Sequence, residues 1–287
     1  MLKGQVAIVT GGGRGLGRVM ALALAGAGAD VVITAMRQPQ ELEESVAEVA
    51  ALGAGRCASM LADVSEDAAC RDLARFAKTT FGPTSILINN AARGAAEQSP
   101  DYRANARPPF WETDPDALRR MLLTNVAGPW SMAAAVVPDM IAAGYGRIIN
   151  VSTSRPTMLF TGGGIYGPSK VALEASTRIW ARELAGTGVT VNVVLPGGAS
   201  DTALIPGDVG NRARAFTPGK GPVGQEGFVE GLLPPAIMAP PVLWLASAES
   251  AGVTGCRFVA RDWDADMPAA SAAIRAQAVS IDFPHVI

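Results

Sequence analysis

The sequence has little of the side-chain chemistry that many hydrolases and metalloenzymes use. Its only histidine is His285, close to the C-terminal end. A Ser-His-Asp or Cys-His site, or a histidine-ligated metal, would need this one residue. The G-x-S-x-G signature of another hydrolase class is also missing from the sequence. We therefore expect no metal site, and any proton transfer must come from tyrosine, lysine or carboxylates.

Cysteine and clustered charge are also scarce. The three cysteines, Cys57, Cys70 and Cys256, are scattered and form no C-x-x-C pair, which is typical of unreactive thiols in a reducing compartment. The net charge is −2 without a basic block, which argues against nucleic-acid or anionic-membrane partners. Apolar stretches such as 19–29 are interrupted before membrane-spanning length, and no signal peptide is recognisable. These features predict a soluble, cytoplasmic protein.

Short apolar runs alternate with helical segments along the chain. The strand expected at 5–10 is followed by a glycine-rich turn, a helix at 18–26 and a strand at 30–36, which together make a βαβ unit. Further strands are expected at 57–61, 85–89, 147–152, 189–195 and 257–260, and further helices at 40–52, 66–81 with Ser65 as N-cap, 114–143, 169–186 and 241–248. Since each strand is a continuous apolar run, the pattern predicts an α/β fold, a doubly wound Rossmann-type parallel sheet with helices on both faces.

We expect one domain over residues 1–261, followed by a C-terminal tail over 262–287. Two long segments, 93–113 and 197–235, follow the carboxyl ends of strands, the edge at which open α/β sheets bind ligands. We interpret both as substrate loops rather than plain surface loops. The tail is expected either to be disordered or to make a subunit contact.

The glycine-rich turn predicts a dinucleotide site. Gly11 permits a tight turn after the first strand, and Gly15 and Gly17 permit close approach of the backbone to a phosphate at the start of a helix. The second strand ends in Thr34-Ala35-Met36-Arg37 without the acidic residue typical of NAD sites. Arg37 and Arg14 instead suit a 2′-phosphate, so we favour NADP(H), with NAD(H) as the alternative.

Tyr166 and Lys170 are four residues apart in Tyr166-Gly167-Pro168-Ser169-Lys170 and would share one face of a helix. An ammonium group beside a phenol favours the phenolate form. On this spacing alone, the two residues could equally be unrelated polar groups on a surface helix. The rest of the sequence has to decide between these interpretations.

A set of motifs together resembles one family. The motifs are Thr10-Gly11-x-x-x-Gly15-x-Gly17, Asn89-Asn90-Ala91-Ala92, Asn125, Tyr166-x-x-x-Lys170, Asn192 and Pro196-Gly197. Their order and spacing over about residues 1–260 resemble the short-chain dehydrogenases/reductases, in the branch with subunits of roughly 250 residues. The resemblance implies an NAD(P)-dependent oxidoreductase that commonly forms tetramers or dimers.

The resemblance also implies roles for individual residues. Tyr166 would be the general acid/base, Lys170 would stabilise its phenolate and bind the nicotinamide ribose, and Asn125 would hold a water in a proton relay. The cofactor-binding residues would be Gly11, Arg14, Gly15, Leu16, Gly17, Arg37, Asp63, Val64, Asn89, Ala91, Tyr166, Lys170, Pro196 and Gly197. Lowering the phenol pKa from about 10 to about 7 needs roughly 4 kcal/mol, for which Lys170 and the positive ring of the oxidised cofactor are the expected sources.

One catalytic position departs from the family pattern, besides Ala92, where the family commonly has glycine. The family has a serine 13 residues before the tyrosine, and this chain has Thr153 there. Threonine offers the same hydroxyl donor, so we assign the role to Thr153, with the flanking Ser152 and Ser154 as alternatives.

The sequence thus predicts hydride transfer between NADP(H) and a secondary alcohol or carbonyl compound. The alternatives are an NAD-dependent dehydrogenase of a sugar, polyol or hydroxyacyl substrate, and a non-catalytic dinucleotide-binding regulatory protein. No motif in the substrate loops names a substrate.

Overall fold

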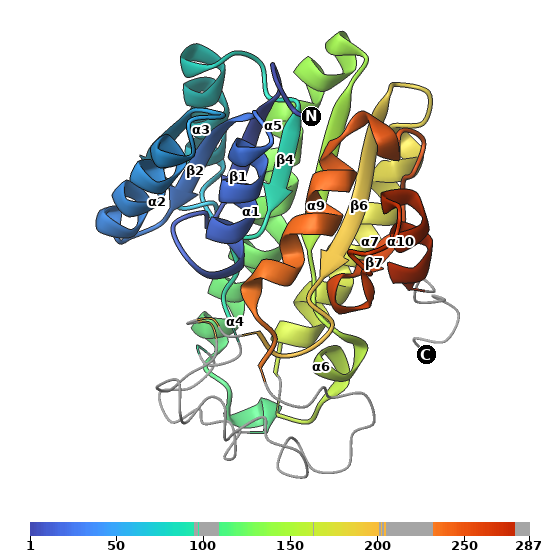
Figure 1. Cartoon of the computed structure of the whole chain (residues 1–287). Coiled ribbons are helices and arrows are strands. Elements are labelled where there is room, and N and C mark those ends of the chain that lie inside the picture. The colour runs from blue at the N-terminus through green and yellow to red at the C-terminus, as the bar shows by residue number, and fades with distance from the viewer. Residues whose placement is uncertain are drawn as a thin grey trace.

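A computed structural model describes residues 1–94, 97, 109–162, 164–200, 202, 204 and 232–278. These residues form one sheet with the strand order β3-β2-β1-β4-β5-β6-β7-β8 (Figure 1). The first seven strands are parallel to their neighbours, and β8 is antiparallel to β7. The strands are β1 Val6–Thr10, β2 Asp30–Ala35, β3 Cys57–Leu61, β4 Ile86–Asn89, β5 Gly146–Val151, β6 Val189–Leu195, β7 Arg257–Val259 and β8 Gln277–Ala278. The predicted doubly wound α/β fold is confirmed.

Helices cover both faces of the sheet. One face carries α1 Gly15–Gly26, α2 Pro39–Leu52, α9 Ala239–Ala246 and α10 Ala269–Ala276. The other carries α3 Asp67–Thr80, α5 Gly128–Ala143 and α7 Tyr166–Glu183. The remaining helical segments are α4 Pro115–Leu122, α6 Arg155–Leu159, the π-helix η3 Leu123–Ala127, and short 3₁₀ turns η2 Phe110–Glu112, η4 Pro235–Met238, η5 Ala248–Ser250 and η6 Ala260–Asp262.

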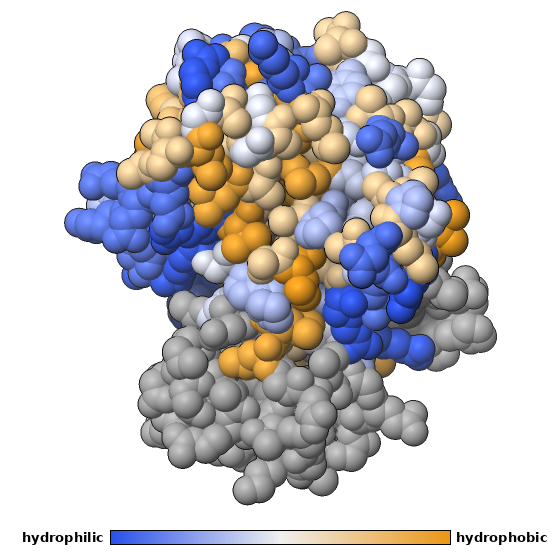
Figure 2. Space-filling model, in the orientation of Figure 1, coloured by the Kyte–Doolittle hydropathy of each residue, from blue (hydrophilic) through white to orange (hydrophobic). Residues whose placement is uncertain are grey.

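Alternation along the strands divides the core into two layers. In β1, Ala7 and Val9 pack in the layer under α1 and α9, and Ile8 between them packs in the layer under α3 and α5. All three side chains are fully buried. Because burying one Val or Ile side chain contributes about 1.5–3 kcal/mol, strands that are apolar on both faces favour this three-layer arrangement. Figure 2 shows an apolar strip over α1 and α9, where these helices lie side by side.

The single long helix expected over 114–143 is interrupted. Asp114 caps its start by accepting hydrogen bonds from the backbone N–H groups of Asp116 and Ala117. α4 then passes through the π-helix η3 into α5, and the N–H of Gly128 donates to the Leu123 carbonyl across the wider turn. The length of this run was expected, but its apolar character was not: by length and composition alone Pro115–Ala143 could cross a membrane. Its buried residues pack against α3 and the sheet, as in the core helix of a globular protein.

Two further expectations are wrong. The strand that begins at Arg257 is not the last, because α10 and β8 follow it and Phe258 pairs with Gln277. The tail as far as residue 278 is therefore part of the folded unit, through alanines that pack in the core. Ser65 is not an N-cap, because its hydroxyl donates to Asp63 Oδ1 at 2.7 Å. Residues 279–287, with His285, and most of the two predicted substrate loops lie outside the described residues.

Candidate active site

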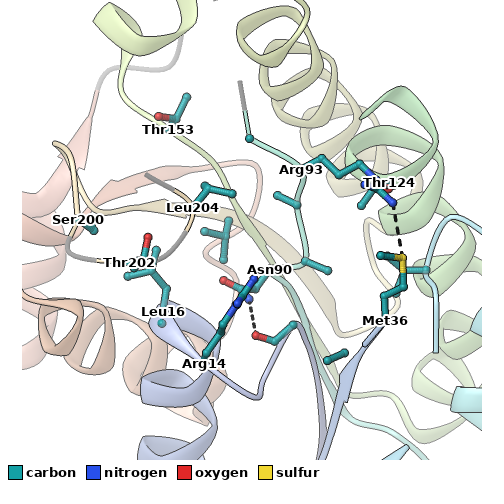
Figure 3. A pocket seen from close by; sticks show the side chains of 18 of the residues that line it. Arg14, Leu16, Met36, Asn90, Arg93, Thr124, Thr153, Ser200, Thr202 and Leu204 are labelled. Atoms are coloured by element: carbon teal, nitrogen blue, oxygen red, sulfur yellow. Dashed lines mark hydrogen bonds between the residues drawn. The ribbon is translucent and has the colours of Figure 1, made fainter. Parts of the chain in front are cut away.

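A cavity of about 650 Å³ opens at the carboxyl ends of the central strands. Its walls come from the glycine-rich turn after β1 and from the segments that follow β2, β3, β4, β5 and β6. Figure 3 shows Met36 and Arg93 on one side of this space and Thr153 and Thr202 on the other, with Arg14 and Asn90 between them. Of the predicted site residues, the following line it: Gly11, Arg14, Gly15, Leu16, Arg37, Asp63, Val64, Ala91, Thr153, Tyr166, Lys170 and Pro196.

The glycine-rich turn brings the start of α1 to the cavity. Gly15 has φ +55°, a left-handed conformation that disfavours side chains. Gly17 lies so close to Gly11 that an added Cβ would collide with the Gly11 carbonyl oxygen. Gly17 itself is buried and does not line the cavity, so its effect is on packing. Arg14 at the N-cap makes no side-chain cap, which leaves the first N–H groups of α1 for another acceptor.

A polar brace joins β1 to the turn after β4. The Thr10 hydroxyl accepts hydrogen bonds from the N–H groups of Asn90 and Ala91, both at 3.0 Å. The Asn90 amide donates back to the carbonyls of Thr10 at 2.8 Å and Gly11 at 3.1 Å. The brace therefore fixes the glycine-rich turn from the side of β4.

Asn89, which was assigned to the cofactor, does not line the cavity. Because side chains alternate along β4, Asn89 is buried in the opposite layer and its amide donates to Asn150 Oδ1 at 2.8 Å. Its neighbour Asn90 lines the cavity instead. The motif was recognised in the sequence, but the side-chain direction at the end of the strand was not.

Thr153, Tyr166 and Lys170 meet at the end of β5. Lys170 donates from Nζ to the Val151 carbonyl at 2.9 Å, and Nζ lies 6.0 Å from the centroid of the Tyr166 ring. The Thr153 hydroxyl lies beside the Tyr166 phenol and lowers the pKa of that phenol against the effect of burial. All three line the cavity, from two elements that are separate in sequence.

The two flanking serines are committed elsewhere. The Ser152 hydroxyl donates to Glu174 Oε1 at 2.6 Å in the interior, and the Ser154 hydroxyl pairs with Thr157 at 2.9 Å. Of the three hydroxyls considered from the sequence, Thr153 is therefore the one beside the phenol.

Burial dominates the proton affinities in this group. It raises the pKa of Tyr166 to about 12, and the neighbouring Thr153 hydroxyl only partly opposes this effect. It lowers the pKa of Lys170 to about 8, opposed by the negative charge of Glu174. The shift expected for Tyr166 was downward, so in the chain itself the sign is reversed. The reason is that removing the phenolate from water costs more than the neighbouring groups return.

Asn125 is fully buried in η3 and does not line the cavity. Its Oδ1 accepts from the Arg93 N–H at 2.8 Å, and its Nδ2 donates to the Arg93 carbonyl and the Ser169 hydroxyl, both at 3.0 Å. Both amide N–H groups are therefore used by the protein. A water in a relay would have to be held without a donor from this side chain.

The rim of the cavity beyond β1, β2 and β3 carries opposite charges. Arg37 and Arg14 are exposed, and Arg14 Nη1 lies 3.4 Å from Glu41 Oε1. Asp63 Oδ1 accepts from the N–H and the hydroxyl of Ser65, at 2.9 and 2.7 Å. Both Glu41 and Asp63 line the cavity.

Several lining residues were not named individually from the sequence, among them Arg93, the first residue of the predicted substrate loop 93–113. Arg93 extends from the turn after β4, donates to the Thr124 hydroxyl at 3.0 Å and faces Met36 Sδ at 3.5 Å (Figure 3). A charged residue directly after the Asn-Asn-Ala-Ala motif was the available signal for it. Gly197, by contrast, does not line the cavity, although its φ of +94° turns the chain beside β7. Other lining residues that were not assigned to the site from the sequence include Thr34, Glu41, Asn90, Thr124 and Thr157, whereas Gly198, Ser200, Thr202 and Leu204 belong to the predicted substrate loop 197–235.

Comparison with known proteins agrees with the fold. The model of the short chain dehydrogenase family matches residues 5–207. A short-chain type dehydrogenase/reductase from Picea abies is 36% identical over 202 residues, covering 68% of this chain and 71% of the relative. A chloroplastic NADPH-dependent aldehyde reductase 2 from Arabidopsis thaliana is 35% identical over 206 residues, covering 68% and 72%.

Solved structures show the same similarity. A blue fluorescent protein from a metagenomic library, in complex with NADPH, matches with a TM-score of 0.73 and 30% identity, covering 89% of this chain and 96% of that one. An NAD⁺-bound xylitol dehydrogenase matches with a TM-score of 0.71 and 25% identity, covering 89% and 97%. The chain belongs to the short-chain dehydrogenase family and is an NAD(P)-dependent oxidoreductase.

Proposed function

We propose that the protein transfers a hydride between NADP(H) and a secondary alcohol or carbonyl compound, with Tyr166 as the general acid/base. The observation that carries this proposal is the meeting of Thr153, Tyr166 and Lys170 in the cavity that the glycine-rich turn opens. A phenol, a hydroxyl donor and an ammonium in one partly dry site are the groups that proton transfer to a carbonyl oxygen requires.

The cavity fits a nicotinamide dinucleotide. The uncapped start of α1 offers backbone N–H groups and the positive end of a helix dipole to a pyrophosphate. The close approach of Gly17 to Gly11 leaves no space for a side chain between turn and helix. When bound, the nicotinamide ring supplies or accepts the hydride. Asp63 and Val64 would hold the adenine end, and Lys170 the nicotinamide ribose.

The chain's own residues would handle the proton. In reduction, the Tyr166 hydroxyl gives its proton to the substrate oxygen while the Thr153 hydroxyl donates a hydrogen bond to the same atom. The Lys170 ammonium, held by the Val151 carbonyl, then stabilises the phenolate. In oxidation these steps run in reverse. Because burial raises the pKa of Tyr166, this positive neighbour is needed before the phenolate can form near neutral pH.

Replacing Tyr166 by Phe tests the mechanism. We expect turnover to fall about a hundredfold or more, since general acid/base catalysis contributes roughly 10²–10⁴. Cofactor affinity, measured by fluorescence titration, should change little. Unchanged turnover would refute the mechanism, and an inactive wild type that binds the dinucleotide tightly would favour the regulatory alternative.

The preference for NADP(H) rests on Arg14 and Arg37 at the rim and on the absence of an acid at the end of β2. One observation favours NAD(H): Glu41 lines the same rim, where a carboxylate would repel a 2′-phosphate and could accept from a 2′-hydroxyl. We expect Arg37→Ala to weaken NADPH about tenfold more than NADH, and Glu41→Gln to strengthen NADPH. Equal losses for both cofactors in Arg37→Ala would contradict the preference.

The substrate is best sought by a screen. Secondary alcohols, sugars, polyols, hydroxyacyl esters and ketones would be offered with each cofactor, and nicotinamide absorbance would be followed. Activity confined to NAD⁺ with a polyol or hydroxyacyl substrate would select the alternative dehydrogenase.

A further inference from the structure

A buried pair of opposite charges lies directly behind the Thr153–Tyr166 pair. It consists of Glu174 on α7 and Arg257 at the start of β7, with side chains 9% and 10% exposed. Arg257 Nε donates to both carboxylate oxygens of Glu174 at 3.1 Å. The proton-transfer mechanism proposed above uses neither side chain.

Both charges hold the segment that carries Thr153. Glu174 Oε1 accepts from the Ser152 hydroxyl at 2.6 Å, and Arg257 Nη2 donates to the Thr153 carbonyl at 2.9 Å. Ser152 and Thr153, the two residues that follow β5, are thereby held from two directions, by α7 and by β7.

The same helix face continues the row of functional groups. Tyr166, Lys170 and Glu174 follow one another at intervals of four residues, so they lie above one another on α7. Lys170 binds the Val151 carbonyl and Glu174 binds the next residue, Ser152. Two successive turns of α7 therefore bind two successive residues of the same segment.

Stability alone does not account for a buried ion pair. Desolvation of two charges often cancels their attraction, and replacing such a pair by apolar residues is often neutral or stabilising. The hydrogen bonds of this pair, however, end on the residues next to the phenol. That placement points to a role in geometry.

We propose that Glu174 and Arg257 act as one positioning unit, which holds the Ser152–Thr153 backbone so that the Thr153 hydroxyl stays against the Tyr166 phenol. The same unit places the Glu174 carboxylate one helical turn from the Lys170 ammonium. The inference rests on the proposed function, because it assigns these residues to the same proton transfer. A small displacement of a positioned group can cost about a hundredfold in rate, so this unit should affect turnover more than binding.

The surroundings of Lys170 support the electrostatic part. The titratable and charged groups around it in the described residues are Tyr166 and Glu174 on its own helix, Arg257 from β7, and Arg155 at the exposed start of α6. Other elements also pack against α7. Of these, β6 and η3 contain no charged residue, and β5 offers Lys170 a backbone carbonyl. The charged side chains of α4 point outward in exposed ion pairs. Glu174 is the negative charge that raises the pKa of Lys170 against the effect of burial.

Arg257→Lys tests the geometric part. A lysine keeps the positive charge but cannot bind Glu174 and the Thr153 carbonyl with one rigid fork. We expect kcat to fall about tenfold, while the KM for the carbonyl substrate and the Kd for NADPH stay within about twofold. The matched control is Arg147→Lys, a buried arginine that donates to the carbonyls of Ser247 and Gly188 at the other end of β5. It should lower the Tm without lowering kcat, and equal kcat values in both variants would overturn the proposal.

A double variant separates geometry from stability. Glu174→Leu with Arg257→Met removes both charges of the pair, so its Tm should lie closer to that of the wild type than the Tm of either single substitution. Its kcat should remain about tenfold low, because nothing holds Ser152 and the Thr153 carbonyl. Recovery of both Tm and kcat would show a purely structural pair and overturn the proposal. Should this variant fail to fold, the Arg257→Lys comparison decides the question.

A measurement without turnover separates this proposal from the proposed function. The chain has four lysines, Lys3, Lys78, Lys170 and Lys220, so ¹³C-labelled lysine signals can be assigned with a Lys170→Met variant. We expect Glu174→Gln to lower the pKa of Lys170 further, since the ammonium loses a negative neighbour and keeps the positive Arg257. An unchanged titration would overturn the electrostatic part. A wild type that oxidises no alcohol and reduces no carbonyl would refute the proposed function and leave this titration as the test of the inference.

Discussion

At the scale of single residues, the position of one hydroxyl carries most of the chemistry. The strand β5 ends at Val151, and the next three residues all have hydroxyl side chains. Hydrogen bonding separates them: Ser152 turns into the interior, Ser154 bonds within α6, and Thr153 meets the phenol. The threonine that departs from the family pattern therefore offers the same donor from the expected place.

Thr153→Ala removes that donor. We expect kcat to fall about tenfold or more, the scale of a lost transition-state hydrogen bond, with the KM for the cofactor unchanged. Thr153→Ser is the matched control and should retain most of the activity, because it keeps the hydroxyl. The measurement is steady-state turnover of both variants with one substrate. Near-normal turnover of Thr153→Ala would rule out its assigned role.

Lys170 predicts a pH dependence of stability. Burial lowers its pKa from 10.5 to about 8, so between these values the unfolded chain binds a proton that the folded chain has released. Unfolding then takes up a proton, and the free energy of unfolding rises with pH across this window, by at most about 3 kcal/mol. Urea titrations at several pH values should show this rise in the wild type relative to Lys170→Met. If the difference in the free energy of unfolding between the two proteins stays constant from pH 8 to 10, the lowered pKa of Lys170 is contradicted.

At the scale of elements, the start of α1 and the turn before it act as one unit. Thr10 and Asn90 brace the turn from β4, and Gly17 lets the first turn of the helix pack against Gly11. The start of α1 reaches the cavity because no side chain lies between Gly17 and Gly11 and none caps the first turn of the helix. Cofactor binding should therefore depend on small residues here more than on any single charge.

Gly17→Ala tests this packing. The added Cβ would meet the Gly11 carbonyl, which is backbone and cannot move aside cheaply. We expect dinucleotide affinity, measured by fluorescence titration, to fall about tenfold or more. Gly26→Ala, at the other end of α1, is the control: its Cβ would lie 3.8 Å from Leu52 Cδ1 in ordinary contact. Equal affinities for the two variants would contradict the assignment of the turn.

At the scale of the whole molecule, the C-terminal region completes the sheet. β8 pairs with β7, and Ala273 and Ala276 of α10 are buried in the same layer as Trp244 and Phe258. The start of β7 carries Arg257, so this region also supports the strand that contacts the Thr153 segment. We propose in addition that the protein is a homo-dimer or homo-tetramer, as the resemblance implies, and sedimentation measures that state.

Ala273→Asp tests the integration of α10. Ala273 is 3% exposed, so a carboxylate there would be buried without a partner, and we expect a loss of about 3 kcal/mol in the free energy of unfolding. Ile274→Asp is the control, because that side chain is 76% exposed and should tolerate the change. Chemical denaturation of both variants gives the comparison. Equal stabilities would mean that α10 does not pack in the core.

The sequence by itself determined the order of the strands as far as β7, the two-sided burial of these strands and the family. Apolar runs, glycine spacing and the Tyr166–Lys170 interval depend on local geometry, which a linear pattern contains. It also indicated Thr153, because that residue stands at a fixed distance from Tyr166.

Only the tertiary structure decided which side chains face the cavity and what surrounds them. Because side chains alternate along β4, Asn90 lines the cavity and Asn89 does not. In the chain by itself burial raises the pKa of Tyr166, and burial is a property of the packed molecule. The pairing of Glu174 with Arg257 joins residues 83 positions apart, and no local pattern records such a contact. Long-range packing, which depends on all elements at once, therefore decides how the segment that carries Thr153 is held.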